Sequence, residues 1–216
     1  MTADTEYSEL GKFVGDDLTT SLSRIEQSIA RLDSKRCQAF LETHGVNPAA
    51  MEAASEIKKL SGQINVTIHA LGILACLPHL LLENERVETV SLGAGNTGRK
   101  FDLETNLRIA EFKFINWRGG PESIRQNGIF KDFFELAEEK TVKKKYLYLL
   151  GTDHALRFFN GGRSLASVLS KNDATRIRFR KLYGDRYLTV RDYFAERRDS
   201  VDIVDVSSWV PAFVTQ

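Results

Sequence analysis

Hydrophobic and polar residues follow two different patterns along the chain, and the change falls near residue 85. Before it, apolar residues recur at three- and four-residue steps, as at Leu18, Leu22, Ile25 and Ile29, which predicts amphipathic helices. After it, short apolar runs rich in strand-forming residues alternate with longer amphipathic stretches. The pattern therefore predicts a helical N-terminal part followed by a part that mixes strands and helices.

The predicted elements are separated by short polar or glycine-containing breaks. The N-terminal part is predicted to be helical over residues 8–43. The elements that follow are a helix at 49–82, strands at 87–92, 100–103 and 107–115, a helix at 122–140, a strand at 146–150, helices at 153–159, 163–170 and 190–198, and a strand at 201–206. This order indicates an α/β fold, an α+β mixed sheet with helices on its faces. We divide the chain into an N-terminal helical extension, residues 1–45, and a second domain, residues 46–216.

The most apolar segment of the chain, residues 64–82, contains Asn65, His69, Pro78 and His79. Such polar interruptions favour a helix buried in a protein core over a helix that spans a membrane. The N-terminus is acidic and polar, unlike a secretory signal. We therefore expect a cytoplasmic protein without a membrane partner.

Composition and charge exclude some classes of protein and leave others open. With 42% hydrophobic and 27% charged residues, the chain is not a disordered polypeptide. Two cysteines, Cys37 and Cys76, are too few for a disulfide framework or a cysteine-based zinc site. The net charge of +1 divides into −5 for residues 1–85 and +6 for residues 86–216. The basic part permits a polyanionic partner, and the amphipathic N-terminal helices suit packing on the rest of the chain or a homodimer.

Three charged residues stand inside the apolar strands at 100–103 and 107–115. Side chains alternate along a strand, so Glu111 and Lys113 point the same way, and a hairpin can place Asp102 beside Glu111. Two converging carboxylates repel each other unless a cation lies between them, and oxygen ligands suit Mg²⁺ or Mn²⁺. Lys113 is then placed to orient or deprotonate a water molecule that attacks a phosphodiester. The alternative is a solvated hairpin face with a surface ion pair, but the apolar neighbours in IAEFKFI favour the site.

The segment FDLETNLRIAEFKF resembles the core of the PD-(D/E)XK nuclease superfamily, with Phe101 where the family name has proline. The resemblance covers roughly residues 49–170 and implies a restriction-endonuclease-like α-β-β-β-α-β core. It implies a Mg²⁺- or Mn²⁺-dependent nuclease that hydrolyses phosphodiester bonds, in DNA more than in RNA. In that family pattern Asp102 and Glu111 hold the metal and Lys113 acts on the water. The alternative function is a catalytically inactive module of the same fold that binds nucleic acid or a partner protein.

Further candidate residues complete this hypothesis. Gln126, at the start of the helix at 122–140, is a fourth catalytic candidate, because the first turn of a helix can approach a phosphate. Some exonuclease-type members have a tyrosine where this chain has Phe130. The upstream site residue implied by the family has three candidates, Glu56, Gln63 and His69. A histidine such as His69 is more often a core or helix-face residue than a ligand. The candidate nucleic-acid contacts are basic side chains near aromatic or apolar residues, or else a solvated edge: Arg118, Arg176, Arg178, Arg180 and Lys181.

Overall fold

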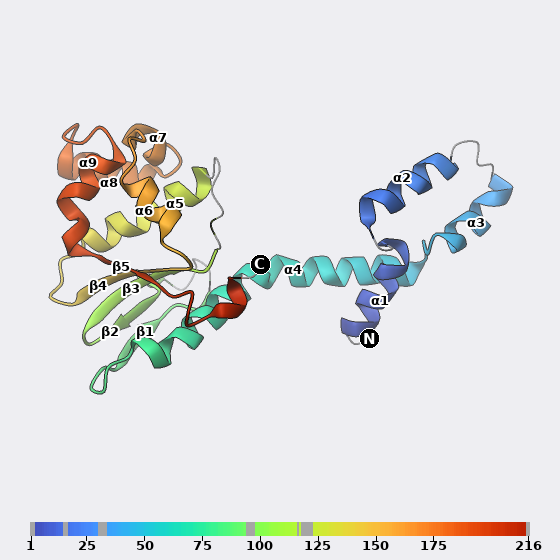
Figure 1. Cartoon of the computed structure of the whole chain (residues 1–216), viewed down its shortest axis with the longest axis horizontal. Helices are drawn as coiled ribbons and strands as arrows, with labels where there is room; N and C mark the ends of the chain where they lie inside the picture. Colours follow the sequence, from blue (N-terminus) through green and yellow to red (C-terminus); the bar gives the residue numbers. More distant parts are fainter. Residues whose placement is uncertain are drawn as a thin grey trace. The chain divides into compact units, whose positions relative to one another are not determined.

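The structure is a computed structural model of the chain, and it describes residues 3–14, 17–29, 34–93, 98–115, 117 and 123–214 (Figure 1). The chain forms two compact units, Met1–Asn65 and Val66–Gln216. The division falls inside one long helix, later in the chain than the boundary drawn from the sequence after residue 45.

The first unit is helical, as its pattern predicts. Its described residues form α1 (Ala3–Val14), α2 (Leu18–Ile29), α3 (Ser34–Thr43) and the beginning of α4 (Pro48–Leu80), so the predicted stretch at 8–43 is interrupted. Asp17 caps α2, because its Oδ2 accepts the N–H of Thr20 at 2.7 Å. Gly45, with a φ of +67°, ends α3, and Oδ1 of Asn47 accepts the N–H of Ala50 at the start of α4. These caps end and begin helices where the hydrophobic period alone continues.

The second unit is built on a mixed sheet. Its strands, among the residues described, lie in chain order across the sheet: β1 (Val87–Val90), β2 (Leu103–Thr105), β3 (Arg108–Lys113), β4 (Lys144–Leu149) and β5 (Asp202–Asp205). β1, β2 and β3 are antiparallel neighbours, whereas β3, β4 and β5 are parallel. Parallel strands need a crossover, which α5 (Ser123–Ala137) provides between β3 and β4. The predicted mixed sheet is confirmed, and β4 lies in the middle of its parallel part, as its apolar run predicts.

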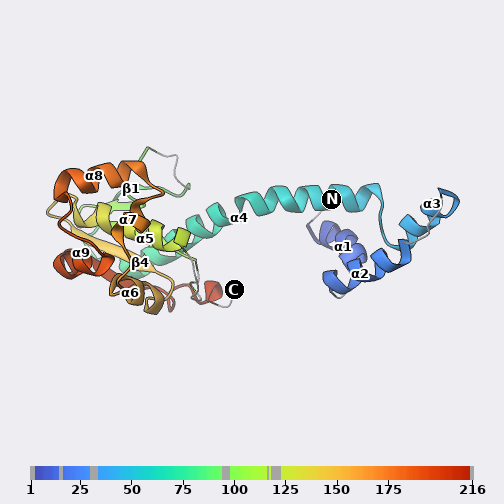
Figure 2. The same ribbon diagram turned by 90° about the horizontal axis from the view of Figure 1, so that it is seen from above.

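Helices cover both faces of this sheet (Figures 1 and 2). On one face, Ile73 of α4 packs with Ala110 and Phe112 of β3. On the other face, Ile109 joins a core made with α5 and four further helices. These helices are α6 (Asp153–Phe159), α7 (Leu165–Leu169), α8 (Asp173–Tyr183) and α9 (Val190–Arg197), followed by the short 3₁₀ helices η1 (Arg198–Ser200) and η2 (Pro211–Phe213). Because side chains alternate along β3, Glu111 lies on the side of α5.

The second strand begins later than its sequence pattern predicts. The expected strand is 100–103, whereas β2 is Leu103–Thr105 and Asp102 lies directly before it. The N–H of Phe112 donates to Oδ2 of Asp102 at 2.9 Å rather than to a backbone carbonyl. A carboxylate thus replaces the backbone ladder at this point, and strand geometry begins one residue later.

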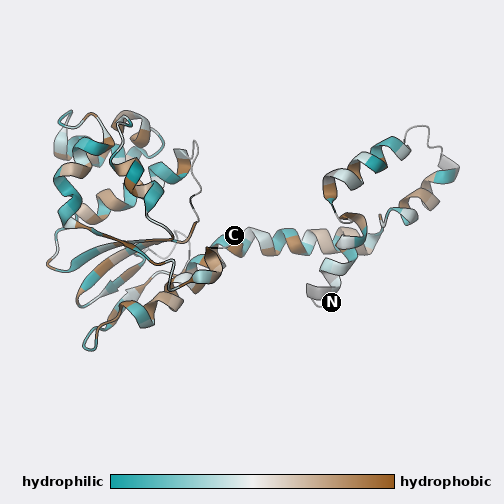
Figure 3. Cartoon of the chain, in the orientation of Figure 1, coloured by the Kyte–Doolittle hydropathy of each residue, from teal (hydrophilic) through white to brown (hydrophobic). Residues whose placement is uncertain are grey.

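α4 is more exposed than its apolar sequence suggests. The expectation of a buried helix over residues 64–82 holds for one face alone: Ile73 and Cys76 are fully buried, whereas Leu71 and Leu74 are 55% and 47% exposed. Figure 3 shows apolar positions along this helix. By length and composition α4 is able to cross a membrane, and a core helix meets the same criterion. A protein without a membrane partner stays a prediction.

One end of the sheet is held by a buried ion pair. The guanidinium of Arg108, at the start of β3, donates to both carboxylate oxygens of Glu85. Glu85 also accepts hydrogen bonds from the Thr105 hydroxyl at 2.6 Å and the Leu82 N–H at 3.2 Å, and Arg108 donates to the Tyr148 hydroxyl at 2.9 Å. Burial raises the pKa of Glu85, but these hydrogen bonds outweigh it and hold the pKa below its usual value. The pair thus ties the turn after α4 to three strand segments.

Removing one partner of this pair is expected to destabilise the second unit strongly. Glu85→Gln leaves a buried guanidinium without a counter-charge, and should lower the free energy of unfolding by about 3–5 kcal/mol in urea denaturation. Because folding lowers the pKa of Glu85, its ionised form adds stability that is lost as the pH falls below about 4.5. The variant should therefore lose less stability than the wild type on acidification.

The matched control is Glu88→Gln. Glu88 forms an ion pair with Lys143 at 2.6 Å on the exposed side of β1. Its loss should cost at most about 1 kcal/mol, because exposed ion pairs contribute little. Equal effects of the two substitutions would contradict the special role of the buried pair.

Candidate functional site

The β2–β3 hairpin brings two of the predicted site carboxylates together. Its register pairs Leu103 with Ala110, so that Asp102 stands opposite Glu111. The two carboxyl groups are joined by a hydrogen bond. Glu111 is buried, with 7% of its surface exposed. The predicted juxtaposition of Asp102 and Glu111 is therefore present, although Asp102 precedes the strand rather than lying inside it.

Helix α4 contributes one of the three upstream candidates. Nε2 of His69 lies 3.3 Å from Oδ1 of Asp102, and the ring meets Phe114 edge-on. Glu56 and Gln63 lie on the exposed part of α4 that belongs to the first unit, where Glu56 forms an ion pair with Lys59 at 3.7 Å. Of the three, His69 is the candidate that contacts the carboxylate pair.

A residue that sequence reasoning missed completes the cluster. Asp132 of α5 is buried, with 5% of its surface exposed, and its Oδ2 lies 2.7 Å from Nζ of Lys113. A signal was available in the pattern: Asp132 stands beside Phe133 and Phe134 on the apolar side of α5, where an acid needs a partner. The described cluster therefore has acidic groups on both sides of Glu111.

The close packing of these groups changes their pKa values. Burial raises the pKa of Glu111 to about 10, and the negative charges of Asp132 and Asp102 raise it in the same direction. Burial also raises the pKa of Asp102, but hydrogen bonds from His69 and from the backbone outweigh it and lower the pKa. Burial lowers the pKa of Lys113, and the carboxylates of Asp132 and Glu111 reverse this, so that the ammonium is stabilised.

The donor set suits a hard cation with few protein ligands. Within the described part of the chain, no three residues among histidine, cysteine, aspartate and glutamate are gathered to hold a metal ion. Mg²⁺ usually takes one or two carboxylates and completes its shell with water and substrate phosphate. Asp102 and Glu111 face each other across the hairpin, and a divalent cation between them would offset the repulsion of the two carboxylates. The residues present thus fit the metal implied by the sequence.

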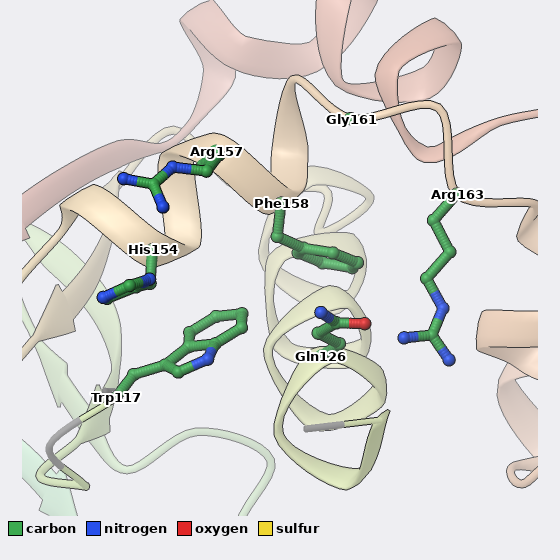
Figure 4. Close-up of a pocket in the computed structure, with 7 residues that line it drawn as sticks. All are labelled: Trp117, Gln126, His154, Arg157, Phe158, Gly161 and Arg163. Carbon is green, nitrogen blue, oxygen red and sulfur yellow. The ribbon is translucent and has the colours of Figure 1, made fainter. Parts of the chain in front are cut away.

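Gln126 belongs to a different group of residues. It lines a pocket of about 310 Å³, and its buried Oε1 has no hydrogen-bond partner in the described part of the chain. The other lining residues are Trp117, His154, Arg157, Phe158, Gly161 and Arg163 (Figure 4). Asp102, Glu111 and Lys113 do not line this pocket. A catalytic role for Gln126 beside them stays a prediction.

The predicted nucleic-acid contacts have different surroundings. Arg118 lies outside the described residues. The other four lie on α8, where Arg176 pairs with Asp173 at 2.8 Å and Arg178 packs over the Phe134 ring, which gives it a structural role. Arg180 and Lys181 are exposed on the same helix.

Comparisons of the chain with protein-family models, with curated proteins and with solved structures find no match. The geometry of the described residues therefore carries the functional argument.

A glycine of α4 allows His69 to reach the site. A Cβ atom at Gly72 would lie 2.5 Å from a ring carbon of Phe114, the residue after β3. We predict that Gly72→Ala lowers the free energy of unfolding by about 1–3 kcal/mol in urea denaturation, because the ring must move. Gly62→Ala is the control on the same helix: nothing lies within 4 Å of that Cβ. It should stabilise α4 by about 0.5–1 kcal/mol. A stabilising Gly72→Ala would contradict the close approach.

Proposed function

We propose that the chain is a metal-dependent nuclease of the PD-(D/E)XK type that hydrolyses phosphodiester bonds, with DNA as its substrate. The observation that carries the proposal is the pairing of Asp102 with Glu111 across the hairpin, with Lys113 two residues further along the same side of β3. A binding module has no need to bury such a group of charges, which costs stability.

The order of elements supports the same proposal. α4, β1, β2, β3, α5 and β4 follow one another along the chain, which is the α-β-β-β-α-β order of a restriction-endonuclease-like core. Glu111 and Lys113 lie on β3, and Asp102 comes directly before β2. His69 and Asp132 come from α4 and α5, on opposite faces of the sheet. A rigid sheet of this kind holds reacting groups more precisely than loops do.

The chemistry follows from the residues that face one another. Asp102 and Glu111 are the groups that would hold Mg²⁺ or Mn²⁺, which supplies positive charge to phosphate oxygens and acidifies bound water. Lys113, held by Asp132, donates hydrogen bonds toward the phosphate or the attacking water. The oxygen of water adds to phosphorus and releases a proton to solvent, one ester P–O bond breaks, and the leaving alkoxide takes a proton from solvent. Asp132 touches Lys113 and acts as a positioning residue.

The proposal predicts metal-dependent cleavage that requires the cluster. The wild type should cleave plasmid and linear DNA with Mg²⁺ or Mn²⁺ and not with EDTA. Asp102→Ala and Lys113→Ala should each lower the rate by about 100-fold or more, because each removes charge stabilisation of the transition state. A gel assay of cleavage measures this.

The matched control is Glu104→Gln. Glu104 is an acid of β2 that forms an ion pair with Lys143 at 2.8 Å instead of joining the cluster. Its substitution should leave the rate within about twofold of the wild type. Cleavage that persists in both Asp102→Ala and Lys113→Ala would contradict the proposal. Parallel assays on RNA of the same sequence test the choice of substrate.

The positioning role of Asp132 has its own test. Asp132→Asn should lower the cleavage rate by about tenfold, because Lys113 loses its ionic partner. The double variant with Lys113→Ala should be no slower than Lys113→Ala alone, since both substitutions remove the same interaction. Glu135→Gln, which affects an ion pair with Lys131 on the same helix, is the control.

An additive loss in the double variant would contradict this role of Asp132 and indicate a structural one. Because Asp132 is buried, unfolding midpoints of all variants are measured first, and Lys113→Arg, which keeps the charge, should retain more activity than Lys113→Ala.

A further inference from the structure

The pocket around Gln126 lies at the edge of the sheet where parallel strands end. Trp117 follows β3, and α6, which follows β4, carries His154, Arg157 and Phe158. The carboxyl ends of parallel strands lie at the same edge, and ligands of α/β proteins commonly bind there. The position of the pocket thus follows from the topology of the sheet.

The positive charge of the pocket favours the binding of an anion. Its lining includes two arginines and no carboxylate. Within the described part of the chain, neither Arg157 nor Arg163 has an ion-pair partner. This contrasts with Arg108, Arg176, Arg186 and Arg197, which all pair with acids. In the view of Figure 4, the two guanidinium groups lie on opposite sides of the aromatic residues. Unpaired guanidinium groups are the usual partners of phosphate.

The remaining lining residues favour the binding of a planar group beside that anion. The Trp117 ring lies between His154 and Phe158, with centroid distances of 6.1 and 6.2 Å. Trp117 is half-buried. Gln126 lines the same pocket, and its side-chain amide can donate to and accept from the edge of a base. Phosphate, a planar ring and a hydrogen-bonding edge together describe a nucleotide.

We propose that this pocket binds one nucleotide of the substrate strand, with its base against Trp117 and the phosphates on its two sides on Arg157 and Arg163. That the nucleotide belongs to a substrate strand rests on the proposed nuclease function. The nucleotide chemistry itself rests on the pocket.

The geometry also places this nucleotide along the strand. Trp117 is four positions after Lys113, which bounds their Cα separation at about 14 Å. On α5, Gln126 and Asp132 are six positions apart, about 9 Å along the helix axis. The pocket and the acidic cluster are therefore near enough for one strand to reach both.

Binding is measured by the fluorescence of Trp117 in the full chain. The sequence contains two tryptophans, so Trp209→Phe leaves Trp117 as the sole source. A deoxynucleoside monophosphate is titrated in EDTA, and saturable quenching with a Kd of about 1 mM or tighter is expected. The same nucleoside without phosphate, and inorganic phosphate alone, should bind about tenfold more weakly or less, because each satisfies half of the pocket.

Variants identify the residues responsible. Arg157→Gln and Arg163→Gln should each weaken the binding of a short oligodeoxynucleotide, measured by the same quenching, by about tenfold. Arg191→Gln removes the same charge from α9, outside the pocket lining, and should leave binding unchanged. Absence of saturable quenching, or equal binding by the arginine variants and the wild type, would overturn the proposal. Equal losses of affinity in Arg157→Gln, Arg163→Gln and Arg191→Gln would also overturn it, because they would indicate general attraction by positive charge.

Two further measurements test this inference separately from the nuclease proposal. A short oligodeoxynucleotide should bind Trp117 more tightly than the mononucleotide does; tighter binding of the free mononucleotide would overturn the assignment to a strand. Lys113→Ala should abolish cleavage and keep full quenching. If Lys113→Ala loses cleavage but both arginine variants bind as the wild type does, the pocket proposal alone is refuted. If binding follows the expected pattern but the wild type never cleaves DNA, the nuclease proposal alone is refuted.

Discussion

Strand β3 is buried on both faces and yet carries three charged side chains, and each of them has to find a partner inside the protein. Arg108, at its beginning, is satisfied by Glu85 from the turn after α4. Lys113, at its end, is satisfied by Asp132 from α5. The turn after α4 and the helix α5 are thus both tied to the same strand through charge.

The middle charge of this strand differs from the other two. Glu111 faces the carboxylates of Asp102 and Asp132, so its neighbours increase the cost of burial. A sequence selected for stability alone would place an apolar residue here, because like charges in a core lower the free energy of unfolding. Such local cost is characteristic of residues kept for chemistry. The contrast between Arg108 and Glu111 on one strand separates structural support from a candidate reacting group.

The parallel half of the sheet gives the site a second component. Antiparallel pairing of β2 with β3 sets Asp102 against Glu111, whereas parallel pairing of β3 with β4 brings the segments after both strands to one edge. Trp117 and α6 meet there, and α5 spans from this edge to Asp132. One strand, shared by both kinds of pairing, therefore connects the acidic cluster with a cationic and aromatic pocket.

The sequence by itself predicted most of the elements, their order and the hairpin cluster, because these depend on periodicity and on residues nearby in the chain. It did not predict helix α8, Asp173–Tyr183. It predicted Asp102, Glu111 and Lys113 together from strand alternation and a short turn. Tertiary structure alone decided the partner Asp132, the division of the chain at residue 65 and the half-exposed α4. It also selected His69 among the three upstream candidates. The register of α5 and α4 on the sheet depends on packing between distant residues, such as Gly72 against Phe114, and a single chain pattern does not encode which face meets which. For the same reason Gln126, placed by sequence beside the carboxylates, lines a separate pocket with Arg157 and Arg163.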